Sequence, residues 1–231
     1  MAHSSAKALS LAAILDRLGP LYSFEVPSAS ALVLILSENI GYLIDDVRRD
    51  GLLREFGQRV GFDGARIART PDAVLLDIAE RGGMRPETRV GRWRRIAEIV
   101  LTECDGDLDA HLRGLPVAGA RKLLKQFPAI GDPGAAKILL FTGLEPRPAL
   151  DSNGLRVMVR LGLVEAAASY APTYRAAIAR LAACFAHDRE RLVAAYMLLR
   201  EHGRALCKRT APHCTACPLD QLCAHAPAKG L

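Results

Sequence analysis

Four cysteines close to the end of the sequence place the strongest constraint on the fold. They follow the pattern C-x6-C-x2-C-x5-C and are Cys207, Cys214, Cys217 and Cys223. Thiolates this close together can surround one metal centre, and sulfur ligands select zinc, copper(I) or an iron–sulfur cluster. The segment from 207 to 223 is therefore expected to form a loop around such a centre.

Two other interpretations of these cysteines stay open. Disulfides are rare in reducing compartments, which lowers their weight here. A four-cysteine zinc site is the stronger alternative, but zinc sites usually pair two C-x2-C knuckles and this loop has one. The uneven gaps favour an iron–sulfur cluster. Cys104 and Cys184 stand alone on apolar helix faces, and we expect both in the core.

Outside this loop the apolar residues recur with the period of a helix. Half of the residues are hydrophobic and only 5% are aromatic, a composition that favours helices over sheets. No segment alternates as a strand would. We predict an all-α fold, in which Thr70 caps the helix that begins at residue 71. The expected helices lie over 9–18, 28–36, 71–81, 92–103, 117–126, 133–142, 173–186 and 189–202.

Length and charge set broad limits on function. A chain of 231 residues can form one large domain or two smaller ones that share a cleft. The formal net charge of +6 makes nucleic acid a plausible partner, although many ordinary enzymes are equally basic. No targeting segment and no apolar run of membrane-spanning length is evident. We expect no membrane partner and a soluble, cytoplasmic protein of the bacterial, nucleoid-associated type.

A second motif runs from Phe127 to Gly134. An amphipathic helix is expected to end near Gln126, a tight turn to pass through Gly131, and Asp132 to cap a new helix with Pro133 in its first turn. Such a helix–hairpin–helix exposes backbone N–H groups at a helix N-terminus, where a DNA phosphate can bind. A plain corner between two helices is the alternative.

A third motif begins at Asp151, in the run Leu-Asp-Ser-Asn, and leads into a helix that contains Arg156. An isolated aspartate before a helix is usually a cap. Together, however, the hairpin, Asp151 and the cysteine loop resemble the endonuclease III superfamily of helix-hairpin-helix (HhH-GPD) DNA glycosylases, over residues from about 27 to 223.

This resemblance implies two helical domains that flank a DNA-binding cleft. One is a six-helix barrel with the helix-hairpin-helix, over 27–145, and the other is an iron–sulfur cluster domain built from 1–26 and 146–231. The implied activity is base-excision repair: a hydrolase breaks the N-glycosidic bond of a base flipped from double-stranded DNA that carries a damaged or mispaired base. The implied cofactor is a 4Fe–4S cluster on the four cysteines, and the chain is expected to act as a monomer.

The resemblance also assigns roles to single residues. Asp151 matches the catalytic aspartate, and Asn153 stands beside it in a D-x-N motif. Asn39 falls where many relatives carry a glutamine that fills the gap left by the flipped nucleotide. A helix cap is the alternative interpretation. The remaining DNA contacts are assigned to the hairpin and the cysteine loop: Ala129, Ile130, Gly131, Gly134, Lys208 and Arg209. A solvated charge cluster is the alternative for the last two.

Departures from the family pattern bear on mechanism. Strand-cutting relatives carry a lysine nucleophile where this chain has Pro133, so we predict base removal with weak or absent lyase activity. Lys137, one turn later, is an alternative nucleophile, which keeps a bifunctional glycosylase/lyase open; its other readings are phosphate contact and solvent exposure. Ala129 replaces the first glycine of the hairpin, and alanine tolerates positive φ poorly.

The excised base is the least constrained prediction. Leu34 stands where adenine glycosylases carry a glutamate, and Glu38 lies one turn late, which argues against adenine opposite oxidised guanine. Uracil or thymine mispaired with guanine, a damaged pyrimidine and an alkylated purine remain, because unstacking costs least at a damaged or mispaired base. Of these, uracil, thymine or a modified pyrimidine is favoured. A catalytically silent lesion-binding module is the alternative. Some of the arginines at 85, 89, 92, 94 and 95 are expected to face DNA.

Overall fold

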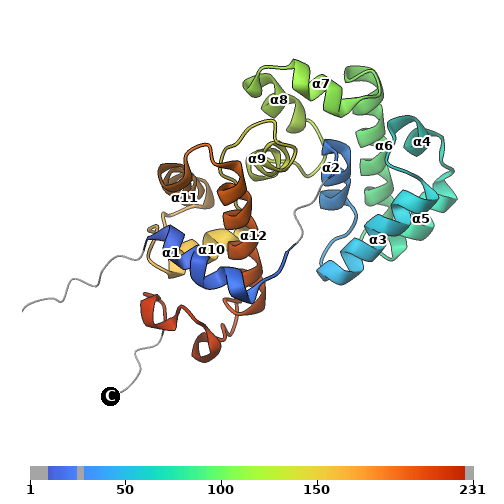
Figure 1. Ribbon diagram of the computed structural model, residues 1–231. Coiled ribbons are helices and arrows are strands. Elements are labelled where there is room, and N and C mark those ends of the chain that lie inside the picture. Colours follow the sequence, from blue (N-terminus) through green and yellow to red (C-terminus); the bar gives the residue numbers. More distant parts are fainter. Residues whose placement is uncertain (1–9, 25–28, 227–231) are drawn as a thin grey trace, which may run out of the picture. The chain divides into compact units, whose positions relative to one another are not determined.

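The computed structural model describes residues 10–24 and 29–226, and within them all named elements are helices (Figure 1). The only strand-like contact among these residues is one bridge between Tyr42 and Gly83. The expected all-α fold is confirmed.

The chain separates into two compact units, one from residues 1–26 and 146–231 and the other from 27–145. No helix in the described ranges is both long and apolar enough to cross a membrane.

The unit over 27–145 is organised around the helix that carries Trp93. This side chain is fully buried and meets the ring of Phe56 edge to face, with ring centroids 4.9 Å apart. The central helix, α6, packs against α2, α4 and α5. The helices of this unit are α2 (Ala31–Asn39), α3 (Asp46–Arg59), α4 (Gly64–Arg69), α5 (Asp72–Glu80), α6 (Pro86–Glu103), α7 (Leu108–Gly114), α8 (Val117–Leu124) and α9 (Asp132–Phe141).

The second unit is organised around α12 (Arg189–Ala205), which packs against each of its other α-helices. Leu192, Tyr196 and Leu199 form a buried stripe on α12, at the spacing that places residues on one helix face. Its partners are α1 (Leu11–Leu18), α10 (Ser152–Arg160) and α11 (Tyr170–Phe185). Short 3₁₀ turns follow at Gly19–Leu21, Cys214–Ala216 and Asp220–Leu222.

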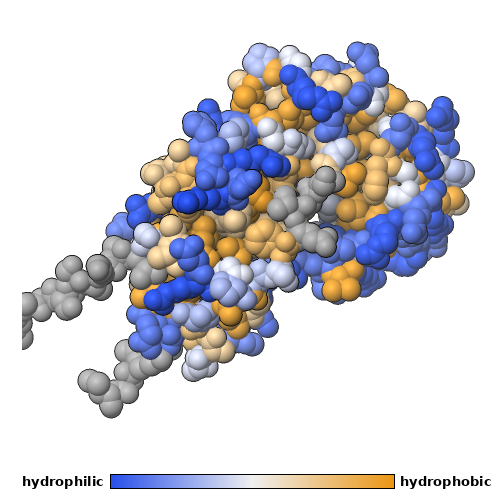
Figure 2. All heavy atoms as spheres, in the orientation of Figure 1, coloured by the Kyte–Doolittle hydropathy of each residue, from blue (hydrophilic) through white to orange (hydrophobic). Residues whose placement is uncertain are grey.

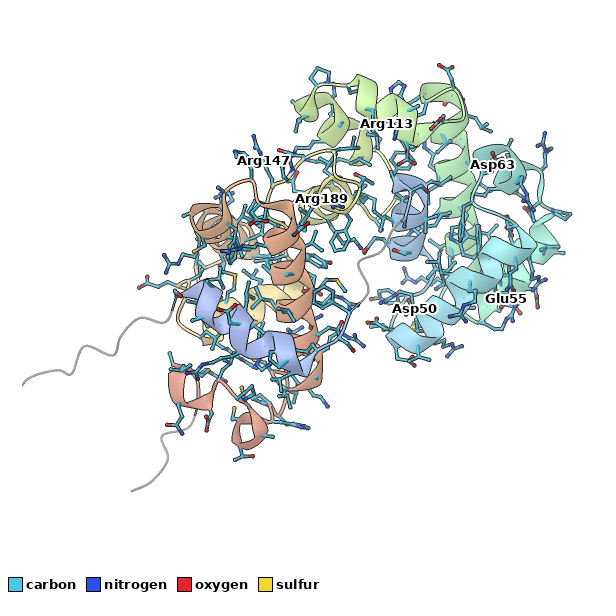
Figure 3. The ribbon with its side chains drawn as sticks, in the orientation of Figure 1. Asp50, Glu55, Asp63, Arg113, Arg147 and Arg189 are labelled. Atoms are coloured by element: carbon cyan, nitrogen blue, oxygen red, sulfur yellow. The ribbon has the colours of Figure 1, made fainter. Side chains whose placement is uncertain are left out.

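Three helices were not predicted from the sequence: α3, α4 and α7. In α3 only Leu52 and Phe56 are buried, so the apolar stripe is too narrow to stand out. Asp50 and Glu55 project from this helix, and hydrophilic side chains cover its outer side (Figures 2 and 3). The helices α4 and α7 are each less than two full turns long, which gives the helical period little room to repeat.

Two local predictions were wrong. Thr70 ends α4 instead of capping α5, whose N-cap is Pro71 without a side-chain hydrogen bond. Cys104 is buried as expected, but Cys184 is exposed. The buried residues of α11 fall every fourth position, at Thr173, Ala177, Leu181 and Phe185, so the apolar stripe turns away from Cys184.

Two of the arginines expected near DNA are structural. Arg89 is 5% exposed and donates to the carbonyls of Ala79 and Met84. Arg94 donates to three carbonyls around the end of α4 and pairs with Asp72. Both guanidinium groups therefore satisfy backbone carbonyls at or near the ends of helices. These two arginines belong to the part of the cluster that serves the structure, and a DNA-facing role for the others stays a prediction.

Candidate active site

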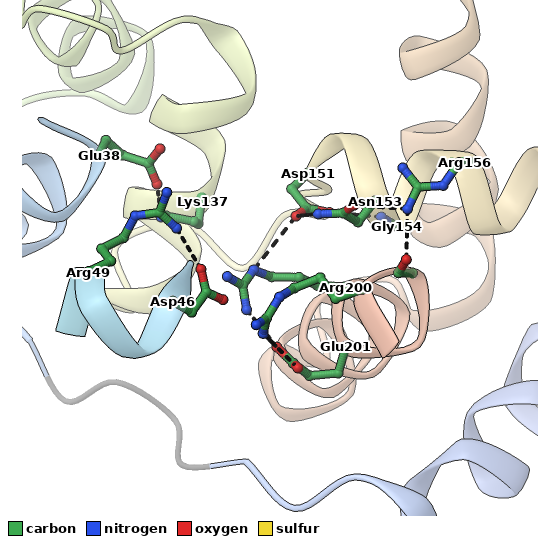
Figure 4. A network of polar contacts seen from close by, with 12 residues as sticks. Glu38, Asp46, Arg49, Lys137, Asp151, Asn153, Gly154, Arg156, Arg200 and Glu201 are labelled. Carbon is green, nitrogen blue, oxygen red and sulfur yellow. Dashed lines mark hydrogen bonds and ion pairs between the residues drawn. The ribbon is translucent and has the colours of Figure 1, made fainter. Parts of the chain in front are cut away.

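Asp151 is the N-cap of α10, and its carboxylate is held by three groups (Figure 4). One oxygen, Oδ1, accepts from the N–H of Gly154 at 2.7 Å, and the other, Oδ2, accepts from Asn153 Nδ2 at 3.0 Å. Arg200 of α12 places Nε 3.6 Å from Oδ2. The side chain keeps 24% of its surface exposed, so the carboxylate is fixed in direction and still open to a ligand.

Asn153 and Arg156 connect this carboxylate to the cysteine loop. Asn153 Oδ1 accepts from Arg156 Nη2 at 2.9 Å, and Arg156 also donates to the carbonyls of Gly203 and Cys207. These contacts orient the Asn153 amide so that its NH₂ faces Asp151. Asn153 thus has the geometry of a positioning residue for the carboxylate.

Gly203 lets α12 approach the start of α10. A Cβ at this position would lie 2.8 Å from both the Cβ and the carbonyl oxygen of Asn153. A larger residue would therefore push apart the two helices that supply Asp151 and Arg200. Neither Gly203 nor Arg200 was singled out from the sequence, because each is about fifty residues from Asp151 and no local pattern links them.

The four loop cysteines are free thiols that line one small cavity. Polar groups are aimed at two of the sulfurs. Arg160 Nη1 lies 3.4 Å from Cys207 Sγ, and His202 Nε2 lies 3.5 Å from Cys217 Sγ. Arg160 also donates to the carbonyls of Lys208 and Arg209, so α10 clasps the first part of the loop.

His202 is 2% exposed, and burial lowers its pKa to about 4. It is therefore neutral at neutral pH, with one ring nitrogen donating and the other accepting. Its Nδ1 lies 3.0 Å from the hydroxyl of Tyr22. When the tyrosine donates to Nδ1, the N–H on Nε2 faces Cys217, an arrangement that stabilises a thiolate ligand.

Both a four-cysteine zinc site and a 4Fe–4S cluster stay open for these four thiols. No three His, Cys, Asp or Glu side chains within 10–24 and 29–226 lie close enough to hold one metal ion. A zinc site needs four donors about 2.3 Å from one atom, whereas the thiolates of a 4Fe–4S cluster are spread around it. Burial raises the pKa of Cys217, and the charges of the other three thiols raise it further. A backbone hydrogen bond from Leu219 lowers it in part. A positive metal centre would relieve that crowding of thiols.

The hairpin joins α8 to α9 through residues 125–131. Gly131 is the N-cap of α9, so Asp132 occupies the first helical position and pairs with Lys125 at 2.8 Å. The capping role expected of Asp132 was therefore wrong. The N–H groups of Ala129, Gly131 and Gly134 have no acceptor in the described part of the chain, whereas that of Ile130 donates to Phe127. Ile130 is also 5% exposed, so it offers the hairpin packing and no free donor.

Ala129 adopts the left-handed conformation, with φ 61°. The turn therefore keeps the backbone of a glycine at a residue that pays a steric cost there, roughly 1 kcal/mol for an L-residue. We expect Ala129→Gly to raise the free energy of unfolding by roughly 0.5–1 kcal/mol and to leave the hairpin unchanged. Urea denaturation measures this. Ala120→Gly inside α8 is the control, and it should destabilise by about as much.

Asn39 and Lys137 are both engaged inside the unit over 27–145. Asn39 is 3% exposed, and its Nδ2 donates to the carbonyls of Ile35 and Pro128, which ties the end of α2 to the hairpin. Its Oδ1 is buried without a partner among the described residues. Lys137 forms an ion pair with Glu38 and keeps 15% of its side chain exposed (Figure 4). The DNA-binding role of Asn39 stays a prediction.

The ion pair bears on Lys137 as the alternative nucleophile. An amine must be free to reach the sugar in order to attack it, and the ion pair holds the Lys137 side chain at Glu38. We expect borohydride to trap no covalent adduct between Lys137 and abasic DNA. Glu38→Gln removes the carboxylate from the ion pair, so this companion variant tests whether the pairing is what keeps Lys137 from reacting. A Lys137-dependent adduct in the unmodified chain would contradict this expectation and establish lyase chemistry.

Solved structures identify the architecture, although no family model and no curated protein matches this chain. A trapped endonuclease III–DNA covalent intermediate aligns over 94% of this chain and 95% of its own, at 17% identity and a TM-score of 0.73. A non-covalent endonuclease III–DNA complex aligns over 94% of both chains, at 16% identity and a TM-score of 0.74. The chain has the endonuclease III fold. A thermostable thymine-DNA glycosylase shares this fold, at 15% identity, a TM-score of 0.73 and coverage of 93% of this chain and 94% of its own.

The endonuclease III fold distributes the predicted residues over the two units. Asp151, Asn153 and the four cysteines lie in one unit, together with the exposed Lys208 and Arg209. The hairpin, Asn39 and Lys137 lie in the other. Within the first unit the structure links Asp151 to Cys207 through Asn153 and Arg156.

Proposed function

We propose that this chain is a monofunctional DNA glycosylase that removes a damaged or mispaired base from double-stranded DNA. The observation that carries the proposal is the carboxylate of Asp151, which is fixed by Gly154, Asn153 and Arg200 and yet remains partly exposed. A cap needs only the first of these contacts. The others suit a group whose position matters for chemistry.

Breaking an N-glycosidic bond builds positive charge on the sugar. A preorganised carboxylate stabilises that charge, or orients the water that attacks the sugar. Asn153 and Arg200 hold Asp151 in place, so little reorganisation is needed during the reaction. The base must first leave the helical stack, which costs least when it is mispaired or damaged.

Water is the proposed nucleophile, because the hairpin supplies no free amine. Pro133 has no nucleophilic group, and Lys137 is paired with Glu38. This supports release of the base without strand cleavage. The free N–H groups of Ala129, Gly131 and Gly134 are the proposed phosphate contacts of the hairpin, and Lys208 and Arg209 are those of the cysteine loop.

The four cysteines are proposed to hold a 4Fe–4S cluster. When bound, the cluster would cross-link the loop and fix its path. Arg160 and His202 would orient and stabilise the thiolates of Cys207 and Cys217. The carbonyl of Cys207 accepts from Arg156, so an ordered loop also supports the positioning of Asn153.

Uracil, thymine or a modified pyrimidine is the proposed substrate. Leu34 is 5% exposed and contributes to the core, so its place in α2 offers no carboxylate for purine chemistry. Glu38 is engaged with Lys137. These residues leave open uracil or thymine mispaired with guanine and a damaged pyrimidine, with an alkylated purine as the alternative.

The test is base release from labelled duplexes that carry uracil, thymine, hydroxymethyluracil, oxidised bases or alkylated bases. Each reaction is read with and without hot alkali, which cleaves abasic sites. Breaks that appear only after alkali would support a monofunctional glycosylase and identify its substrate. Breaks without alkali would overturn the monofunctional assignment, and binding without release from any duplex would favour a lesion-binding module.

A further inference from the structure

An open pocket of about 500 Å³ lies beside the start of α10, within the unit formed by 1–26 and 146–231. It is bounded by the first turns of α10 and α11, the end of α12 and the residues after Cys207. The side chains that matter to its chemistry are Asn153, Arg156, Tyr170, Arg204, Lys208 and Arg209, and no acidic residue lines it. Asp151 is not part of its wall.

The charge of this pocket suits an anion. Two of its cations are committed to the protein, since Arg156 donates to carbonyls and to Asn153, and Arg204 pairs with Glu201 at 2.8 Å. Lys208 and Arg209 are exposed and use their side chains in no hydrogen bond or ion pair with other described residues. Two such cations at the rim can bind a phosphate group.

One wall of the pocket is aromatic. Tyr170 is 48% exposed, and its ring stacks on that of Tyr174, with centroids 5.7 Å apart and planes at 16°. The ring of Tyr174 supports one side of the Tyr170 ring, and Tyr170 lines the pocket. Partial burial and the charge of Asp151 raise the pKa of Tyr170, which agrees with a position close to the candidate catalytic carboxylate.

Two exposed cations beside an exposed aromatic ring match the chemistry of a nucleotide. We infer that this pocket binds one unpaired nucleotide of the DNA, with its base against Tyr170 and its phosphate at Lys208 and Arg209. This inference rests on the proposed function. The occupant is a neighbour of the excised nucleotide, because Asp151, which acts on the excised one, does not line the pocket.

This contact would favour lesions whose neighbouring base is easily unpaired. Stacking is tolerant of sequence because every base has a π-face, and it contributes affinity when the base is free to leave the duplex. The pocket therefore assigns Tyr170 a role in DNA binding and none in bond breaking.

The experiment is a scan in which single bases next to the lesion are removed. Duplexes carry 2′-fluoro-deoxyuridine, whose glycosidic bond resists cleavage, and a tetrahydrofuran residue replaces one flanking nucleotide at a time. Dissociation constants are measured for the unmodified chain and for Tyr170→Leu. We expect loss of the base at one position to weaken binding of the unmodified chain about tenfold, and Tyr170→Leu to bind as weakly with no further loss at that position.

Matched variants separate stacking from folding and from charge. Tyr170→Phe keeps the ring and should bind as the unmodified chain does. Tyr42→Leu removes another exposed tyrosine, in the other unit, and should not be coupled to that position. Lys208→Gln and Arg209→Gln should each lower the slope of log K against log salt by about 1, whereas Arg180→Gln, on the exposed surface of α11, should not.

If the loss of one flanking base weakens binding of the unmodified chain but not of Tyr170→Leu, the proposed nucleotide site is supported. Intact binding of DNA with no coupling at any position overturns it and leaves the glycosylase proposal standing. Failure of the unmodified chain to bind any duplex overturns both.

Discussion

Asp151→Asn is expected to reduce the rate of base release about 10³-fold, while affinity for the lesion duplex changes less than about threefold. Asparagine keeps the size of the side chain and the cap to Gly154, but it removes the charge that stabilises the developing sugar cation. It also places an amide or a weaker acceptor opposite Asn153 Nδ2, so one positioning contact is weakened. Single-turnover release from the preferred duplex, read after alkali, measures the effect.

Asp188→Asn is the matched control for this variant. Asp188 caps α12 in the same unit and accepts from the N–H of Arg191 at 3.1 Å, so the substitution removes one charge from a similar cap. Its rate of base release should stay within about twofold of the unmodified chain, because capping effects on stability are small. Full activity of Asp151→Asn, or equal losses in both variants, would show that Asp151 is only a cap.

Cys217→Ser is expected to prevent binding of the proposed cluster and to destabilise the unit that contains the cysteine loop. A ligand that binds only the folded state at a hundred times its dissociation constant contributes about 2.7 kcal/mol, so we expect losses of roughly 3 kcal/mol or more. For a chain of this size that lowers Tm by about 6–12 °C. Iron content, visible absorption and thermal unfolding are the measurements. Base release should be largely retained at temperatures where the variant is still folded, since none of the four cysteines is a hydrogen-bond partner of Asp151.

Cys184→Ser is the control for this second prediction. Cys184 is exposed on α11 and stands outside the cysteine loop, so iron content and Tm should stay unchanged. A Cys217→Ser protein that lacks iron and still unfolds at the same temperature would contradict the structural role of the cluster. Retention of one zinc ion per chain by the unmodified protein, in place of iron, would contradict the cluster itself.

Much of the fold was predictable because its causes are local. A helix with a continuous apolar stripe carries its own period, and α9, α11 and α12 were placed within a few residues of their observed ends. The polar α3 and the short α4 and α7 were not, since their helical state depends on packing with distant partners. The hairpin and the cysteine loop were recognisable because each is defined by short, fixed spacings.

The candidate site divides in the same way. The sequence by itself determined the all-α class, the reactive residue types, the proline at 133 and the loop of four cysteines, all of which are readable over one or two turns of chain. Only the tertiary structure decided that Arg89 and Arg94 serve helix ends, that Asn39 is buried against the hairpin and that Lys137 is paired with Glu38. It also brought Arg200 to Asp151 and let Gly203 admit α12 beside α10. These outcomes depend on which distant side chains share a burial site or a charge, and no local pattern records that.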